Sequence, residues 1–149
     1  MNRPKQIGTA AESALVKAAR QDGFGQAERR ALGGSKDLGD ILLCPGVIIE
    51  VKAGKQTENP SDGQVAAWWA ETRAEAVHAA ADVALLVLRR RGKGDPLAWW
   101  CWMDLRQLLH LTSVGIMPDE RTSTVLIRAS VADALRMLRA AGWGDPLDA

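Results

Sequence analysis

The sequence predicts a single α/β domain spanning residues 1–149, in which helices pack against a mixed α+β-type sheet. Helix-like and strand-like periodicities alternate along the chain, which favours a sheet covered by helices. Val83–Leu88 is a continuous apolar run of strand length, typical of a central strand buried on both faces. Apolar residues make up 47% of the chain, which is enough for a core without disulfides or a structural metal.

The N-terminal part is expected to form a helix and then a short strand. Apolar residues recur at helical spacing from about Gly8 to Gln21, and Asp22-Gly23 provides a stop signal. Residues 26–32 fit a short strand, and the glycine-containing residues 33–36 fit a flexible loop.

A hairpin is predicted next, because the β-rich residues 40–43 and 47–52 flank Cys44-Pro45-Gly46. If this three-residue loop is centred on Pro45, the numbers of opposing residues sum to ninety, and Leu43 faces Val47. A bulge in the loop would shift this register by one residue.

The second half is predicted to continue with a helix and two strands. Residues 63–80 have helical spacing, residues 83–88 form the central strand, and the tryptophan-rich residues 97–103 form its partner after a turn. These elements complete a core of about residues 5–103, in the order helix, three strands, helix, two strands.

A small α/β extension is expected over residues 104–149. Its elements are a helix at 104–110, a strand at 124–128 and a last helix that Ser130 caps and that ends at Gly142.

Composition restricts the compartment and the partners. The two cysteines form neither a disulfide framework nor a zinc site, which fits a reducing cytosol. No signal segment or membrane span is visible, so we expect a cytoplasmic protein of a bacterial or phage-infected cell that does not bind membranes. The net charge of +1 means that any binding to DNA must depend on local basic patches.

The hairpin predicts a cluster of charged side chains. The same register places Asp40 opposite Glu50. Side chains in such positions have Cβ atoms roughly 4.5–5.5 Å apart, and like charges there are unfavourable, so the two carboxylates need a cation between them. Strand alternation puts Lys52 on the same face as Glu50.

A further acid lies on the first helix. Glu12 shares a helical stripe with Leu15, Val16 and Ala19, at spacings of three, four and seven residues. Burying an unpaired charge is costly, so a carboxylate on a core-facing stripe needs a metal ion, a water or a lysine as partner. The alternative is that Glu12 lies at the edge of the stripe and reaches solvent.

These residues resemble the motif of the PD-(D/E)XK nuclease superfamily. The resemblance is carried by Gly39-Asp40, nine further residues, Glu50-Val51-Lys52, and a preceding helix that bears Glu12. It is closest to archaeal-type Holliday junction resolvases and their phage or prophage relatives, which share an early helical glutamate and a glycine- and serine-containing loop before the aspartate. It covers residues 5–55 well and the next helix and strands in outline, and it does not extend beyond Met103. Gly39 replaces the proline of the motif, a common departure.

The resemblance implies a restriction-endonuclease-like core and Mg²⁺-dependent cleavage of DNA, with Mn²⁺ as a substitute. The implied metal ligands are Asp40, Glu50 and the backbone carbonyl of Val51. Glu12 would bind a second metal through water or position the nucleophile, and Lys52 would hold the attacking water or a phosphate oxygen. Carboxylate and carbonyl oxygens suit these hard cations.

Other residues are candidates for contacts with DNA. They are Arg29, Arg30, Ser35, Lys36, Lys55 and Gln64, with a further basic patch at Arg89-Arg90-Arg91 and Lys93. Solvated turns or strand ends are the alternative for the basic patches, and ordinary polarity at a helix start is the alternative for Gln64. The tryptophans at 68, 69, 99, 100 and 102 could stack on unpaired bases, although a core or a dimer interface is favoured for them.

The leading interpretation is an endonuclease that resolves four-way junctions as a homodimer, because two-fold symmetry would match the junction. One alternative is a nuclease of the same fold that acts on linear or end-containing DNA, as a restriction-type or repair enzyme. A non-catalytic DNA-binding protein of this fold is the other alternative, although both acids and the lysine are retained.

Overall fold

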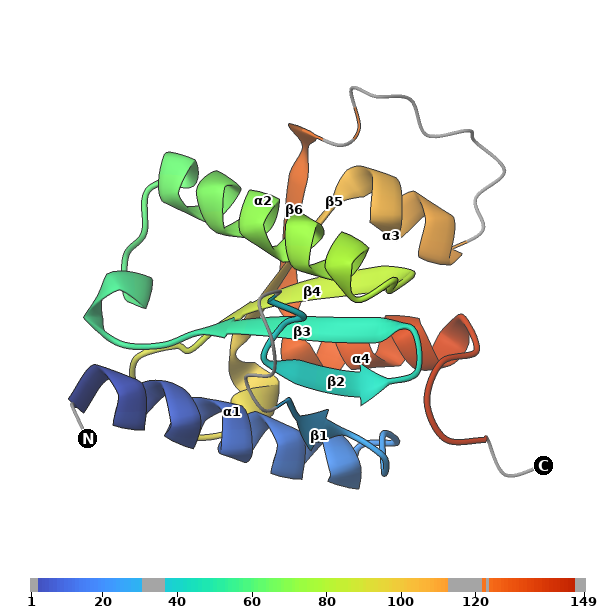
Figure 1. Ribbon diagram of the computed structural model, residues 1–149, viewed down its shortest axis with the longest axis horizontal. Coiled ribbons are helices and arrows are strands. Elements are labelled where there is room, and N and C mark those ends of the chain that lie inside the picture. Colours follow the sequence, from blue (N-terminus) through green and yellow to red (C-terminus); the bar gives the residue numbers. More distant parts are fainter. Residues whose placement is uncertain (1–2, 31–36, 113–121, 123, 147–149) are drawn as a thin grey trace.

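The computed structural model describes residues 3–30, 37–112, 122 and 124–146, which form a mixed sheet covered by helices (Figure 1). In chain order the elements are α1 (Arg3–Gln21), β1 (Glu28–Arg29), β2 (Ile41–Cys44), β3 (Val47–Lys52), the 3₁₀ helix η1 (Lys55–Thr57), α2 (Asp62–His78), β4 (Val83–Leu88), the 3₁₀ helix η2 (Pro96–Ala98), β5 (Trp100–Asp104), α3 (Leu105–Thr112), β6 (Leu126–Ser130) and α4 (Val131–Ala140). The predicted α/β class is confirmed.

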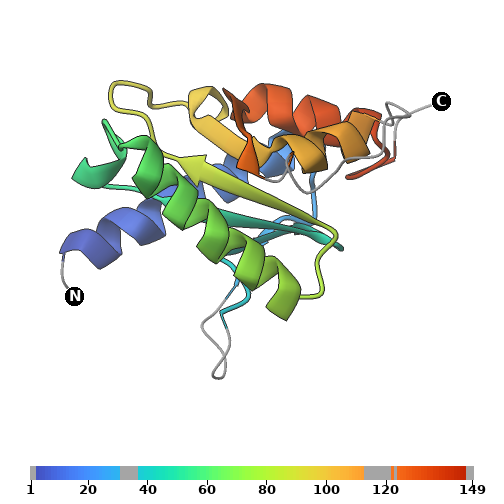
Figure 2. The same ribbon diagram turned by 90° about the horizontal axis from the view of Figure 1, so that it is seen from above.

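The six strands lie in the order β1-β2-β3-β4-β5-β6. All neighbouring strands are antiparallel except β3 and β4, which are parallel and are connected through α2. All six residues of β4 are buried, as predicted for a central strand. Helix α2 packs on β3 and β4, whereas α4 packs on β5 and β6, and Figure 2 shows the sheet between these two helices.

The helices form where apolar residues recur at helical spacing. Helix α1 buries Ala11, Leu15, Val16 and Ala19 and ends at Gln21 as predicted. It begins at Arg3 rather than at Gly8, because its exposed polar first turn adds nothing to the apolar periodicity that marked the start. Among the described residues, no helix has both the length and the apolar character needed to cross a membrane.

Two predicted strands are shorter than expected. Within 26–30, the described part of the predicted strand 26–32, only Glu28 and Arg29 form a strand, and both are exposed, so no burial pattern marks it. The predicted strand at 97–103 begins only at Trp100, because residues 96–98 form η2, where Asp95 accepts a hydrogen bond from the backbone N–H of Leu97. The predicted loop 33–36, with Ser35 and Lys36, lies outside the described residues.

The turn of the hairpin differs from the prediction. Its loop has two residues, Pro45-Gly46, and Cys44 pairs with Val47, so the predicted pairing of Leu43 with Val47 is wrong. A bulge between Leu42 and Cys44 adds one residue to β2. Beyond the bulge the strands have the predicted register, because Ile41 pairs with Ile49 and Leu42 with Ile48.

The C-terminal segment completes the same sheet. Strand β6 pairs with β5 in antiparallel orientation, and α4 packs beneath them. The predicted cap is confirmed, because the Ser130 hydroxyl accepts a hydrogen bond from the N–H of Asp133. Helix α4 ends at Ala140, two residues before Gly142.

Candidate active site

Asp40 occupies a bend immediately before β2, where it is held by β3. Its backbone N–H donates to the carbonyl of Ile49 at 3.1 Å, and its Oδ2 accepts from the N–H of Val51 at 2.8 Å. The aspartate side chain therefore takes the place of a strand partner at the open end of the hairpin. Since the N–H and C=O of one strand residue point to the same edge, the carbonyl of Val51 also faces Asp40.

Glu50 lies in the layer between β3 and α2, beside Glu75. Both side chains are buried, and the Oε2 atom of each has no hydrogen-bond partner among the described residues. Together with Asp37 they offer three carboxylate oxygens that lie within 4.8 Å of one another. This group could hold a metal ion.

Burial and mutual repulsion strongly perturb these acids. Desolvation, together with the nearby carboxyls of Glu75 and Asp40, raises the pKa of Glu50 to about 12. Burial also raises the pKa of Glu75, and the charges of Asp37 and Asp40 add to the increase. A divalent cation would offset this repulsion, and an oxygen-only donor set is the kind that Mg²⁺, Mn²⁺ and Ca²⁺ prefer. The residues therefore fit a hard cation.

Glu12 approaches the same region from α1. Its Oε2 forms an ion pair with Arg29 on β1, with an Nη2–Oε2 distance of 3.0 Å, and only 16% of its side chain is exposed. Burial and the charge of Asp40 raise the pKa of Glu12, while Arg29 opposes that increase. Glu12 is thus an electrostatic neighbour of Asp40, and its direct partner is an arginine.

Lys52 lies on the same face of β3 as Glu50 and beneath α2. Its Nζ is 3.2 Å from the Oε2 of Glu71. Burial lowers the pKa of Lys52, but the charges of Glu50, Glu71 and Asp40 outweigh burial and raise it. The lysine therefore stays an ammonium ion beside the carboxylates.

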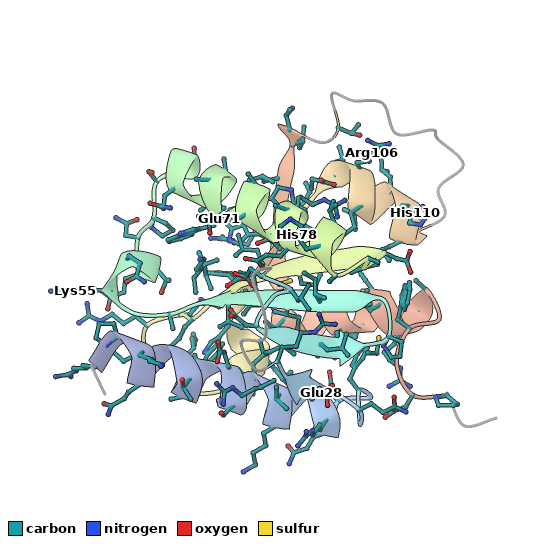
Figure 3. The ribbon with its side chains drawn as sticks, viewed as in Figure 1. Glu28, Lys55, Glu71, His78, Arg106 and His110 are labelled. Carbon is teal, nitrogen blue, oxygen red and sulfur yellow. The ribbon has the colours of Figure 1, made fainter. Side chains whose placement is uncertain are left out.

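The candidate DNA contacts among the described residues differ in their surroundings. Arg30 donates to the carbonyl of Leu38 at 3.3 Å, and Arg29 is occupied by Glu12. The side chains of Lys55 and Gln64 are exposed, and Lys55 lies on η1, three residues after Lys52 (Figure 3). For Gln64, the described contact is made by its backbone N–H, which donates to Ser61 at the start of α2.

Sequence reasoning missed three acids that the fold brings to the cluster: Asp37, Glu71 and Glu75. The signal for Glu75 was present, because it shares a buried stripe of α2 with Trp68, Thr72 and Ala76. Glu71 lies four residues earlier on the same helix, at the spacing that makes it a neighbour of Glu75, and its carboxylate contacts Lys52. No pattern singles out Asp37, which turns the chain by accepting a hydrogen bond from the N–H of Gly39.

The tryptophans divide between the core and the surface of the sheet. Trp68, Trp69 and Trp99 are buried, in agreement with the core interpretation. Trp100 is half-buried, and the guanidinium groups of Arg90 and Arg128 each lie 3.8 Å from its ring centroid. In this arrangement arginines, rather than bases, stack on Trp100.

Comparisons with models of protein families, with curated proteins and with solved structures found no match to this chain. The geometry of the acidic cluster and the resemblance of its motif are therefore the basis for assigning a function.

Proposed function

We propose that this protein is a Mg²⁺-dependent DNA endonuclease with a restriction-endonuclease-like core. The observation that carries the proposal is the convergence of Asp40, Glu50 and Lys52 at the open end of the hairpin, where a buried carboxylate oxygen of Glu50 has no hydrogen-bond partner among the described residues. Two acids and a lysine at the end of one hairpin supply groups suited to phosphodiester cleavage: oxygen ligands for a hard cation, and a positive charge for the phosphate.

Asp40, Glu50 and the carbonyl of Val51 would hold Mg²⁺, or Mn²⁺ in its place. Asp37 and Glu75 supply further oxygens beside Glu50. When bound, the cation would lower the pKa of a water molecule and stabilise negative charge at the phosphate. The protein's contribution is to fix these ligands on β3, on α2 and in the segment just before β2, so that little reorganisation is needed.

Lys52 would bind a phosphate oxygen or the attacking water. Its ammonium group stays charged because Glu50, Glu71 and Asp40 surround it. Glu12 would position the attacking water or bind a second cation through water, and Arg29 would hold the Glu12 side chain in place. A charged donor such as the Lys52 ammonium group stabilises the transition state most when it is already in place before the reaction.

A four-way DNA junction is the substrate we propose, with a homodimer as the active form. The resemblance of the motif supports this choice, since two symmetric sites could cut two strands of a symmetric junction.

Incubation of the purified protein with Mg²⁺ and three labelled substrates tests the proposal. The substrates are a four-way junction, a linear duplex and a single strand, and the variants are Asp40→Asn and, as an exposed acid outside the cluster, Asp62→Asn. Paired nicks in the junction that Asp40→Asn abolishes and Asp62→Asn retains would support the full proposal. Equal cleavage of linear duplex would favour a restriction-type or repair nuclease, and binding without Mg²⁺-dependent cleavage would contradict the enzyme.

A further inference from the structure

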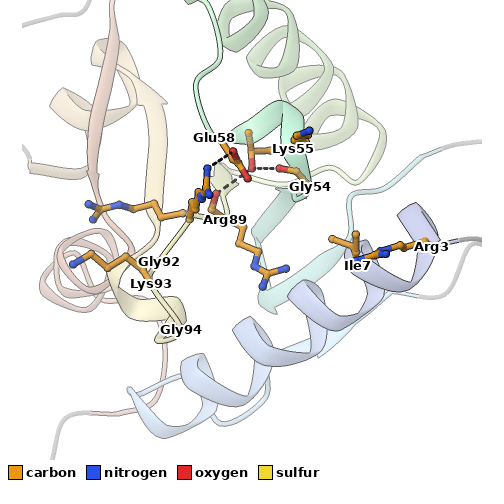
Figure 4. Close-up of a pocket in the computed structure, with 12 residues that line it drawn as sticks. Arg3, Ile7, Gly54, Lys55, Glu58, Arg89, Gly92, Lys93 and Gly94 are labelled. Carbon is orange, nitrogen blue, oxygen red and sulfur yellow. Dashed lines mark hydrogen bonds and ion pairs between the residues drawn. The ribbon is translucent and has the colours of Figure 1, made fainter.

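A basic cavity lies at the ends of β3 and β4, beyond Lys52. Its volume is about 550 Å³, and its walls come from the loops that follow the two strands and from the first turns of α1 (Figure 4). The charged residues that line it are Arg3, Lys55, Glu58, Arg89, Arg90, Arg91 and Lys93. Six cations and one acid therefore share a single cavity.

Most of this positive charge is not neutralised. Glu58 forms an ion pair with Arg91 at 3.4 Å. Within the described ranges, no acid forms an ion pair with Arg3, Lys55, Arg89 or Lys93. Cations gathered in a concave surface repel one another, and their combined field attracts an anion.

The cavity is fixed in position relative to the acidic cluster. The N–H of Arg89 donates to the carbonyl of Lys52 at 3.0 Å. The buried hydroxyl of Thr57 lies 2.9 Å from the carbonyl of Gly54 and 3.1 Å from that of Arg89, which ties the two loops together. A ligand in the cavity would thus sit at a set distance from Lys52.

The walls also leave room for a bulky anion. A Cβ atom added at Gly92 or Gly94 would meet no atom within 4 Å. The volume falls in the range of roughly 300–1,000 Å³ that is common for ligand sites. Guanidinium groups pair with phosphate oxygens through two parallel hydrogen bonds, and ammonium groups bind them as point charges.

We infer that this cavity is a second phosphate-binding site, which holds phosphate groups of the DNA strand that passes Lys52. The inference rests on the proposed nuclease function in one respect, namely that the bound strand is the one that is cut. The phosphate could be an internal phosphodiester or the terminal phosphate of a strand, and both present the same oxygens to the arginines.

Binding of fluorescent DNA in EDTA tests the site without cleavage. The variant Arg3→Ala/Arg89→Ala/Lys93→Ala is compared with Arg106→Ala, an exposed arginine on α3 that lies far from Lys55 (Figure 3). We expect the triple variant to bind about tenfold more weakly and to lower the slope of log K against log salt by roughly 2 to 3. Arg106→Ala should leave both values near those of the wild type.

Two further binding experiments identify which phosphate the cavity holds. In the first, a neutral methylphosphonate replaces one phosphate at a time along the strand. In the second, a strand with a 5′-phosphate is compared with one that has a 5′-hydroxyl. If the site takes an internal phosphodiester, a methylphosphonate beyond the cleaved bond should weaken DNA binding by the wild type but not by the triple variant. Preference for a 5′-phosphorylated end, lost in the same variant, would assign a terminal phosphate instead.

Unchanged affinity and salt slope in a folded triple variant would overturn the inference. If the triple variant does not fold, the exposed pair Lys55→Ala/Lys93→Ala repeats the test with the same expected direction. The two proposals fail separately. If these variants change neither cleavage nor binding, the nuclease proposal stands and the phosphate site in the cavity is wrong. If the variants weaken DNA binding but the wild type does not cleave DNA, the phosphate site stands and the nuclease proposal is wrong.

Discussion

The carboxylates of Glu50 and Glu75 lie beside each other between β3 and α2, and each residue is only 6% exposed. One oxygen of each has no hydrogen-bond partner among the described residues. Two acids in such a place raise each other's free energy when ionised, since burial weakens screening by water. The pair therefore favours a bound cation or a shared proton over two free charges.

Replacing Glu75 by glutamine should stabilise the protein in EDTA and weaken cation binding. Removing one buried charge relieves repulsion, and a gain of about 1 kcal/mol would raise the melting temperature by roughly 2–4 °C. Loss of a carboxylate beside the ligands should weaken Mg²⁺ binding by about tenfold or more. Thermal melts across a Mg²⁺ titration measure both effects.

Glu71→Gln is the matched control for this experiment, because Glu71 is on the same helix but is exposed. Its melting temperature and Mg²⁺ affinity should stay close to those of the wild type. If the two variants behave alike, the repulsion assigned to Glu75 is absent.

The raised carboxyl pKa values predict how stability in EDTA depends on pH. The pKa of Glu50 is raised to about 12 by desolvation first and then by Glu75 and Asp40. A group whose pKa is higher in the folded state binds its proton more tightly there, so its stabilising effect is complete below the unfolded value, near 4.5, and is lost as pH rises toward the folded value. Melting temperatures in EDTA should therefore fall from pH 5 to pH 9.

Two controls identify the origin of this pH dependence. Mg²⁺ should flatten it, because a bound cation stabilises the ionised acids. Glu50→Gln should also flatten it in EDTA, since the titrating group is gone. A steep decline that persists in Glu50→Gln would show that other groups cause it.

The fold was largely predictable because its elements carry strong periodic signals. The apolar run of β4 and the buried stripe of α1 identify a central strand and a covering helix. Weaker signals failed where local geometry decides. The exposed β1 has no burial pattern, and the 3₁₀ helix η2 interrupts the tryptophan-rich segment.

The acidic cluster was only partly predictable. Asp40, Glu50 and Lys52 lie on one hairpin, so local spacing was enough to bring them together. Glu75 reaches Glu50 only through the crossover from β3 to α2, and Asp37 reaches it from the segment before β2, and no short motif encodes either approach. The register of β2 against β3 beyond the turn was predicted from a three-residue loop, whereas the hairpin has a two-residue turn and a bulge whose effects on the register cancel.

Gly46→Ala should therefore disturb the hairpin that positions Asp40. Gly46 has a φ of 90°, and a Cβ atom there would lie 2.9 Å from the Trp143 ring and 3.0 Å from Asp82. Strain and crowding together should lower stability by about 1–3 kcal/mol, measured by urea unfolding. Gly63→Ala is the control, because its Cβ would meet only one atom, 4.0 Å away, and alanine favours the helix. Equal stability of the two variants would mean that the turn does not need its glycine.

Lys52→Ala tests the central chemical role. If the ammonium group stabilises the phosphate in the transition state, its loss should lower the cleavage rate by roughly 100- to 1,000-fold while DNA binding changes little. Lys52→Arg should not restore the rate, because a planar guanidinium does not replace a compact ammonium at this half-buried position. Glu71→Gln breaks the ion pair between Lys52 and the exposed Glu71 but leaves the ammonium group in place. The cleavage rate of this variant should therefore remain within a few-fold of the wild type. Single-turnover cleavage at saturating protein separates rate from binding. A similar loss in Lys52→Ala and Glu71→Gln would assign Lys52 to holding α2 against β3 rather than to the reaction.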